Sequence, residues 1–188
     1  KWFLPGKLKD VQRLDEKLVG IYIPYWTFDS NTFTRYQGER GTHYTDTIRT
    51  QQMVNGKMTT VTQTVVKTRW RSVSGQVNVN FDDSLIVACT TLGEKYVDKL
   101  EPFDLHNLLP FDEKFLSGFR TEIYKISVQE GFVKVKVKMG RIIRAHVLQD
   151  IGGDEQRIHN SNTSFNDVSF KHILLPIWVS AFRYNNKV

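Results

Sequence analysis

The chain has 188 residues, of which 40% are hydrophobic, and its 26 Lys and Arg residues outnumber its 20 Asp and Glu residues by six. This composition is typical of a globular protein and excludes a disordered chain. A single cysteine, Cys89, excludes an internal disulfide and a zinc site built from several cysteines. No segment has the roughly 20 apolar residues needed to cross a bilayer, and the first residues lack the apolar core of a signal peptide. We therefore expect a soluble, cytoplasmic chain.

Both ends of the chain suggest that it is part of a longer protein. The chain begins with Lys1 rather than Met, and it stops soon after an apolar, aromatic segment. We expect residues 1–17 to be a connector and residues 18–188 to form a single domain.

The first half of the domain has the composition of β-strands. Residues 18–28 are rich in β-branched and aromatic side chains and predict a strand. Two Thr-rich runs, 42–50 and 59–68, flank Asn55-Gly56, which is the favoured centre of a two-residue turn. We therefore expect a long β-hairpin with an exposed face. Further strands are predicted at 74–81 and 84–91 and, near the end of the chain, at 164–171 and 172–184.

The middle of the chain is acidic and predicts short helices. Between Asp82 and Glu113, eight carboxylates meet two lysines, which gives a local balance of 2 − 8 = −6. We expect short helices at 93–100, 104–109 and 112–118, with Asp104 and Asp112 as N-caps.

Residues 127–150 fit two patterns. Residues 132–138 alternate like a strand, but a longer series of positions follows 4-3-4-3 spacing and favours a helix. That series is Val128, Phe132, Val135, Met139, Ile142, His146 and Gln149. Ser127 and Glu130 would form a capping box, and Gly152 would end the helix. The sequence thus predicts an α+β fold: a mainly antiparallel sheet with a long hairpin, short helices and one long helix packed on the sheet through this heptad seam.

The residues that commonly carry catalysis form no recognisable constellation. No two of the five histidines have the spacing of metal ligands, and we expect His146 to lie in the core. Cys89 follows a strongly apolar run, which indicates an inert, buried thiol. The segment 152–156, Gly-Gly-Asp-Glu-Gln, is similar to the diguanylate cyclase signature, but a helix C-cap followed by a polar turn explains it better. We expect no enzymatic activity and no cofactor in this chain.

Basic residues offer two candidate binding surfaces. Lys134, Lys138, Arg141 and Arg144 lie on the predicted long helix and could contact anionic lipid, phosphates or an acidic protein, or simply form a solvated face. Arg69, Trp70 and Arg71 could contact nucleic acid, with Trp70 either stacking on a base or lying in the core at the end of a strand.

Four segments, in order along the chain, resemble a bacterial family of zinc-ribbon proteins often labelled primosomal protein N′ or replication factor Y-like. These segments are 18–29, 36–41, 150–158 and 170–178. In that family, Cys-rich zinc ribbons precede this region, hydrophobic membrane segments can follow it, and some members are encoded beside phage-shock and flotillin-like membrane-stress proteins. The resemblance implies zinc only in an N-terminal region that this chain lacks, and it supplies no catalytic residue. Of the polar residues in or beside the matching motifs, we expect Arg40, Asp154, Arg157 and Lys171 to form a polar cluster.

The function predicted from these observations is that of a non-enzymatic interaction or scaffold domain. We expect it to bind a partner protein or an anionic membrane surface, at the inner face of the membrane in the full-length protein. The alternative is a nucleic-acid-binding accessory protein related to replication.

Overall fold

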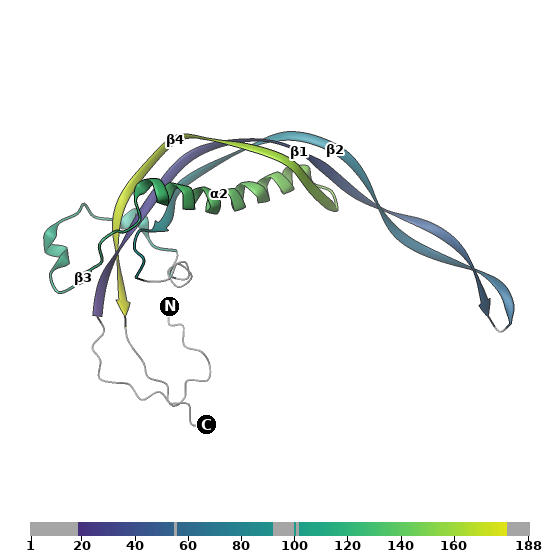
Figure 1. Ribbon diagram of the computed structural model, residues 1–188, viewed down its shortest axis with the longest axis horizontal. Coiled ribbons are helices and arrows are strands. Elements are labelled where there is room, and N and C mark those ends of the chain that lie inside the picture. Colours follow the sequence, from purple (N-terminus) through teal and green to yellow (C-terminus); the bar gives the residue numbers. More distant parts are fainter. Residues whose placement is uncertain (1–18, 55, 92–99, 101, 180–188) are drawn as a thin grey trace, which may run out of the picture. The chain divides into compact units, whose positions relative to one another are not determined.

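We describe a computed structural model of the chain, covering residues 19–54, 56–91, 100 and 102–179 (Figure 1). Three long strands dominate it: β1 (Val19–Val54), β2 (Lys57–Val87) and β4 (Glu155–Val179), with 36, 31 and 25 residues. The other elements are the short strand β3 (Arg120–Thr121), the α-helix α2 (Val128–Ile151) and the 3₁₀ helices η2 (Leu105–Asn107) and η3 (Glu113–Leu116).

The prediction of an α+β fold is wrong, because the described chain is mostly β-strand and α2 is its one α-helix. The short helices expected at 104–109 and 112–118 are single 3₁₀ turns, and the one expected at 93–100 lies almost entirely outside the described residues. Asp112 does cap its turn by accepting a hydrogen bond from the Lys114 N–H, whereas Asp104 makes no side-chain cap. The acidic residues that suggested helix starts therefore mark turns.

The strands are longer than predicted because residues that usually interrupt strands are accommodated within them. The sequence suggested separate strands on either side of Asp82-Asp83, but β2 continues through this point. Asp83 has φ +49°, and its N–H donates to the Asp29 carboxylate of β1 at 2.8 Å. This cross-strand bond holds the irregular residue beside β1.

The predicted hairpin is confirmed. β1 ends at Val54, β2 begins at Lys57, and Gly56 between them has φ +76°, a conformation that favours glycine. Asn55 itself is outside the described residues. β1 lies between β2 and β3 in the sheet, and β4 also pairs with β1. β3 runs parallel to β1, with Ile21 opposite Arg120 and Tyr22 opposite Thr121.

The predicted long helix and both of its ends are also confirmed. The N–H of Ser127 donates to the Glu130 carboxylate at 2.8 Å, and the N–H of Glu130 donates to the Ser127 hydroxyl at 3.3 Å. These reciprocal bonds are a capping box. At the other end, Gly152 has φ +64°, and its N–H donates to the Leu148 carbonyl.

The heptad seam predicted for this helix is wrong over its second half. The buried residues follow four-residue spacing: Val135, Met139, Ile143, Val147 and Ile151. Ile142 and His146, which the heptad placed in the core, are exposed. A stripe with four-residue spacing winds slowly around an α-helix, which suits packing against twisted strands.

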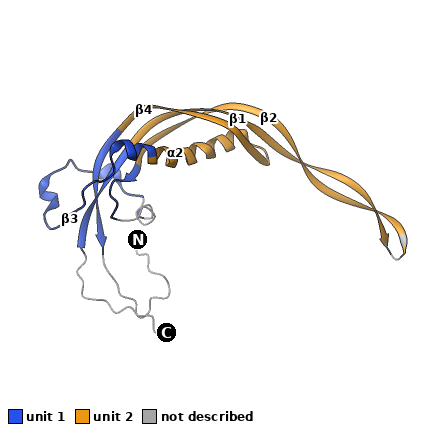
Figure 2. Cartoon of the chain, viewed as in Figure 1, with its two compact units in different colours: residues 1–27, 85–133, 170–188 blue, residues 28–84, 134–169 orange. Residues whose placement is uncertain are grey.

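The chain divides into two compact units (Figure 2). Unit 1 comprises residues 1–27, 85–133 and 170–188, and unit 2 comprises residues 28–84 and 134–169, so the long strands and α2 contribute to both. The core of unit 1 gathers buried side chains from β1, from β2 and the residues just after it, and from β4: Ile23, Tyr25, Leu85, Val87, Cys89, Ile173 and Leu175. Cys89 is buried, as predicted.

In unit 2, α2 lies along the strands (Figure 2), and alternate residues of β1 are buried. These residues are Phe28, Ser30, Thr32, Thr34 and Tyr36. The Ser and Thr hydroxyls among them form hydrogen bonds to neighbouring strands: Ser30 to the Asn166 carbonyl, Thr32 to the Val79 carbonyl and Thr34 with the Thr163 hydroxyl. These bonds offset the cost of burying small polar side chains.

Candidate functional site

Unit 1 contains a pocket of about 620 Å³ with mostly apolar walls. Its walls come from the segment around η2 and η3, from residues 121–124 and from β4, and Tyr22 of β1 also lines it. Its apolar side chains include Leu108, Leu109, Phe111, Phe115, Leu116, Ile123, Ile173, Leu174 and Pro176. We call this site the apolar pocket.

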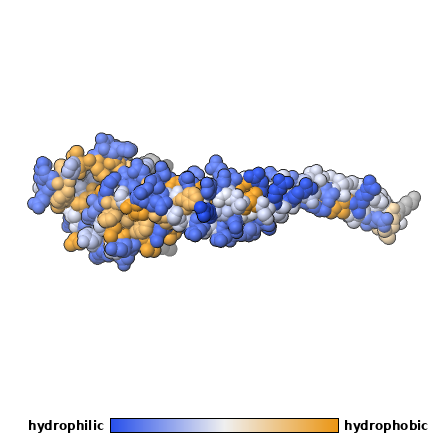
Figure 3. All heavy atoms as spheres, turned by 90° about the horizontal axis from the view of Figure 1, so that it is seen from above, coloured by the Kyte–Doolittle hydropathy of each residue, from blue (hydrophilic) through white to orange (hydrophobic). Residues whose placement is uncertain are grey.

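Several side chains that line the apolar pocket are unusually exposed. Leu109 is 71% exposed, Phe111 67% and Ile123 75%. Figure 3 shows hydrophobic residues at the surface in the part of the molecule that belongs to unit 1. Because soluble proteins rarely leave large apolar patches uncovered, such a patch indicates a contact surface.

The polar groups at the apolar pocket have structural partners. Glu122 accepts a hydrogen bond from the Thr91 hydroxyl at 2.8 Å. The His172 ring lies 4.8 Å from the Trp26 ring and 5.4 Å from the Tyr124 ring, measured between centroids. Partial burial lowers the pKa of His172, which favours the neutral form of its ring.

The predicted polar cluster is partly assembled, in unit 2, where α2 leads into β4. The Arg40 side chain of β1 donates a hydrogen bond to the Ile151 carbonyl at the C-terminus of α2. A cation at this end of a helix is favourable. The Asp154 N–H donates to the Gly41 carbonyl at 2.9 Å, and the Asp154 carboxylate accepts from the His43 N–H at 2.7 Å. Arg40 and Asp154 therefore attach the turn after α2 to β1.

Glycines make this attachment possible. Gly153 has φ +83°, and a Cβ there would lie 2.7 Å from the Gly41 carbonyl oxygen. The Gly-Gly-Asp segment thus has a structural role, as the helix C-cap interpretation of the sequence expected.

Arg157 and Trp70 lie together in unit 2. The Arg157 guanidinium is 3.7 Å from the centroid of the Trp70 ring, and it also lies 3.8 Å from the Glu39 carboxylate. Arg69 instead lies over the Tyr44 ring at 5.0 Å. Arg71 is exposed on β2. Since Arg157 covers one face of Trp70, the arrangement is less favourable for stacking on a base than the sequence suggested.

Lys171, the fourth member of the predicted cluster, is on the part of β4 that belongs to unit 1, whereas the other three are in unit 2. The basic residues of α2 differ in exposure: Arg141 and Arg144 are exposed, whereas Lys134 and Lys138 are half-buried.

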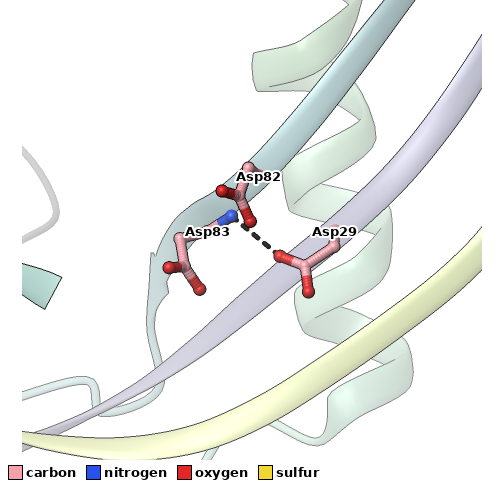
Figure 4. A group of neighbouring side chains, drawn as sticks. All are labelled: Asp29, Asp82 and Asp83. Atoms are coloured by element: carbon pink, nitrogen blue, oxygen red, sulfur yellow. Dashed lines mark hydrogen bonds between the residues drawn. The ribbon is translucent and has the colours of Figure 1, made fainter. Parts of the chain in front are cut away.

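Asp29, Asp82 and Asp83 bring three carboxylates within 4.8 Å of one another, an arrangement that could hold a metal ion (Figure 4). Both oxygens of Asp29 already accept hydrogen bonds, one from the Asp83 N–H and one from the Ser169 hydroxyl, each at 2.8 Å. These bonds hold β2 and β4 beside β1, which accounts for Asp29 without an ion.

The sequence did not reveal the apolar pocket, because its walls come from segments that are far apart in the chain. One signal was available: Leu108-Leu109 and Phe111 form an apolar run around Pro110, at the boundary between two predicted short helices, where polar residues are usual.

Among the described residues, no helix is long and apolar enough to span a membrane. The chain is similar to the uncharacterized protein YdjG of Bacillus subtilis (strain 168), with 23% identity over 175 residues. The similar region covers 90% of this chain and 46% of YdjG, so the chain spans about half the length of this relative. No protein-family model and no solved structure matches the chain.

Proposed function

We propose that this chain is a non-enzymatic interaction domain that binds a partner protein through the apolar pocket of unit 1. The observation that carries this proposal is the exposure of Leu109, Phe111 and Ile123 at the pocket. The expected ligand is a protein segment that presents bulky apolar side chains.

The energetics of burial support this assignment. Fully burying one large apolar side chain contributes about 1.5–3 kcal/mol, and a few such residues dominate most interfaces. Three of them with three matching side chains contribute roughly 9–18 kcal/mol before the cost of association is subtracted, and a micromolar complex needs about 8 kcal/mol after that subtraction. Glu122 is held by its hydrogen bond from Thr91, and the pocket is otherwise lined mostly by apolar side chains, which favours binding over catalysis at this site.

Photo-crosslinking in cells that produce the full-length natural protein tests the proposal. Benzoylphenylalanine at position 111 or 123 should crosslink to one protein, whereas the same group at Ile142, exposed on α2, should not. The purified partner should bind the wild-type protein at least tenfold more tightly than Ile123→Lys, and Ile142→Lys should bind like wild type. Equal crosslinking from position 142, or unchanged binding by Ile123→Lys, contradicts the proposal.

An anionic membrane surface is a second candidate ligand, through α2. The observation that favours it is the exposure of Arg141 and Arg144 on the same helix as Val137, which is 58% exposed. A helix that exposes both cations and apolar groups suits an anionic interface. Sedimentation with vesicles containing phosphatidylglycerol should be lost in Arg141→Glu/Arg144→Glu, and sedimentation that survives this change excludes α2 as the lipid contact.

We also infer that the chain belongs to a longer zinc-ribbon protein that works at the inner face of the membrane. The support is the order of the four sequence motifs. Zinc analysis of the full-length natural protein should find bound metal in the region before this chain, and a metal-free full-length protein contradicts the inference.

A further inference from the structure

The β-hairpin continues well beyond the residues that α2 and β4 cover. In residues 42–54 of β1 and 57–69 of β2, which we call the distal ribbon, almost every described side chain is exposed. Figure 1 shows these two strands continuing past the end of α2 and the start of β4. An isolated two-stranded ribbon is marginally stable in water, so the distal ribbon gains from additional pairing.

The outer edge of β2 is suited to such pairing. β2 is the edge strand of the sheet in the described chain, since its strand partner there is β1. Its residues 58–66 read Met-Thr-Thr-Val-Thr-Gln-Thr-Val-Val, nine residues without a charge, a proline or a glycine. Natural edge strands are usually protected against pairing by charged residues, by proline or by a bulge. The matching part of β1 carries both Asp46 and Arg49.

We propose that residues 58–66 pair antiparallel with the same residues of a second copy of this chain. A two-fold axis at Thr62 places Thr60 of each copy opposite Thr64 of the other, and Met58 opposite Val66. Met58 and Val66 are 63% and 66% exposed, and this pairing covers both. Cross-strand Thr pairs and apolar pairs stabilise sheets, and an isologous contact of this kind closes as a dimer.

The charges around the edge favour a second copy over a charged ligand. Residues 58–66 carry no cation for phosphate groups, which makes nucleic acid or anionic lipid a poor fit. In the proposed register Lys57 lies opposite Lys67 of the other copy. Lys67 is already paired with the Asp46 carboxylate at 2.5 Å, which reduces the repulsion.

Analytical ultracentrifugation over a range of concentrations tests the proposal. A two-strand contact is smaller than the roughly 1,200 Å² of most stable interfaces, so we expect a dimer that dissociates on dilution. Thr62→Lys should give a monomer at every concentration, because a charge on an edge strand opposes pairing. Thr47→Lys, on β1 of the same ribbon, is the matched control and should dimerise like wild type.

The register is tested by Thr62→Cys under mild oxidation. Two copies paired at Thr62 bring their Cα atoms within the 4.4–6.8 Å that a disulfide requires, and the native Cys89 is buried and does not compete. We expect a disulfide-linked dimer from Thr62→Cys and none from Thr47→Cys. The proposal is overturned if the wild-type chain is monomeric throughout, if Thr62→Lys still dimerises, or if both cysteine variants crosslink equally. The apolar pocket of unit 1 plays no part in these outcomes.

Discussion

The hydrogen bond between Tyr36 of β1 and Asp150 of α2 should contribute measurably to stability. The Tyr36 hydroxyl donates to the Asp150 carboxylate at 2.5 Å, and the Tyr36 side chain is buried. Hydrogen bonds to charged groups contribute about 1.5–3 kcal/mol. Tyr36→Phe keeps the ring and removes only the donor, so we expect the free energy of unfolding to fall by about that amount.

The pKa of Tyr36 gives a second measure of how much this side chain contributes to stability. Burial, followed by the hydrogen bond to Asp150 and the charge of that carboxylate, raises the pKa of Tyr36 from 10.0 to about 12. A shift of two units corresponds to at most about 2.7 kcal/mol, of which burial accounts for the largest part and the hydrogen bond to Asp150 for the next. Because the folded-state pKa is the higher one, this stabilisation is fully present below pH 10 and is lost as the pH rises through 12.

Urea unfolding of the wild-type protein and Tyr36→Phe at pH 7 measures the first effect, and the same pair between pH 9 and 12 measures the second. The difference between the two proteins should shrink as the phenol ionises. Asp150→Ala should remove most of the effect of Tyr36→Phe in a double-mutant cycle. A difference below 0.5 kcal/mol at pH 7, or one that stays constant to pH 12, would refute this reasoning.

Three further predictions follow from close contacts and caps. Gly75→Ala should destabilise the protein, because the added Cβ would lie 2.5 Å from the Tyr36 hydroxyl. Gly140→Ala, where a Cβ in α2 would meet open space, should instead stabilise it by about 1 kcal/mol. The urea unfolding midpoints of the two variants should therefore shift in opposite directions, and equal shifts contradict the prediction. Ser127→Ala should lower the free energy of unfolding by about 1 kcal/mol, because it removes the capping box. Thermal unfolding measures this effect, and Ser74→Ala, at an exposed position on β2, is the control. Hydrogen bonds from Thr68 and His43 lower the pKa of Glu155, so its contribution to stability should be present above the ordinary glutamate pKa and disappear as the pH falls through the lowered value. Glu155→Gln should flatten this part of the acid unfolding curve, and a curve identical to wild type argues against it.

Local signals in the sequence identified the elements whose determinants are adjacent in the chain. Asn55-Gly56 marked the hairpin, and Ser127 with Glu130 marked the start of α2. The buried face of α2 could not be predicted in the same way, because it depends on the twisted strands against which the helix packs. His146 is exposed for that reason, although its spacing along the chain resembles that of Met139.

For the predicted site residues, too, the sequence did not reveal contacts between distant segments. Sequence reasoning placed four residues in one polar cluster: Arg40, Asp154, Arg157 and Lys171. Unit 2 does place Arg40 and Asp154 at the same turn. Their partners, the Ile151 carbonyl and the Gly41 carbonyl, are backbone groups that no residue pattern reveals. The apolar pocket of unit 1 was missed because four separate segments, the first in β1 and the last in β4, build it.

The placement of charge changes what should drive association. Within unit 2, Arg40 is hydrogen-bonded to the C-terminal end of α2, and Arg157 contacts Trp70 and Glu39. Lys67 is paired with Asp46. We assign two other surfaces to partners. The apolar pocket is lined mostly by apolar side chains, and the 58–66 edge offers uncharged side chains and backbone groups. Salt screens charge contacts but leaves apolar contacts and backbone pairing largely unaffected. Binding through either surface should therefore persist from 50 to 500 mM NaCl, whereas binding through Arg141 and Arg144 to an anionic membrane should weaken steeply over the same range.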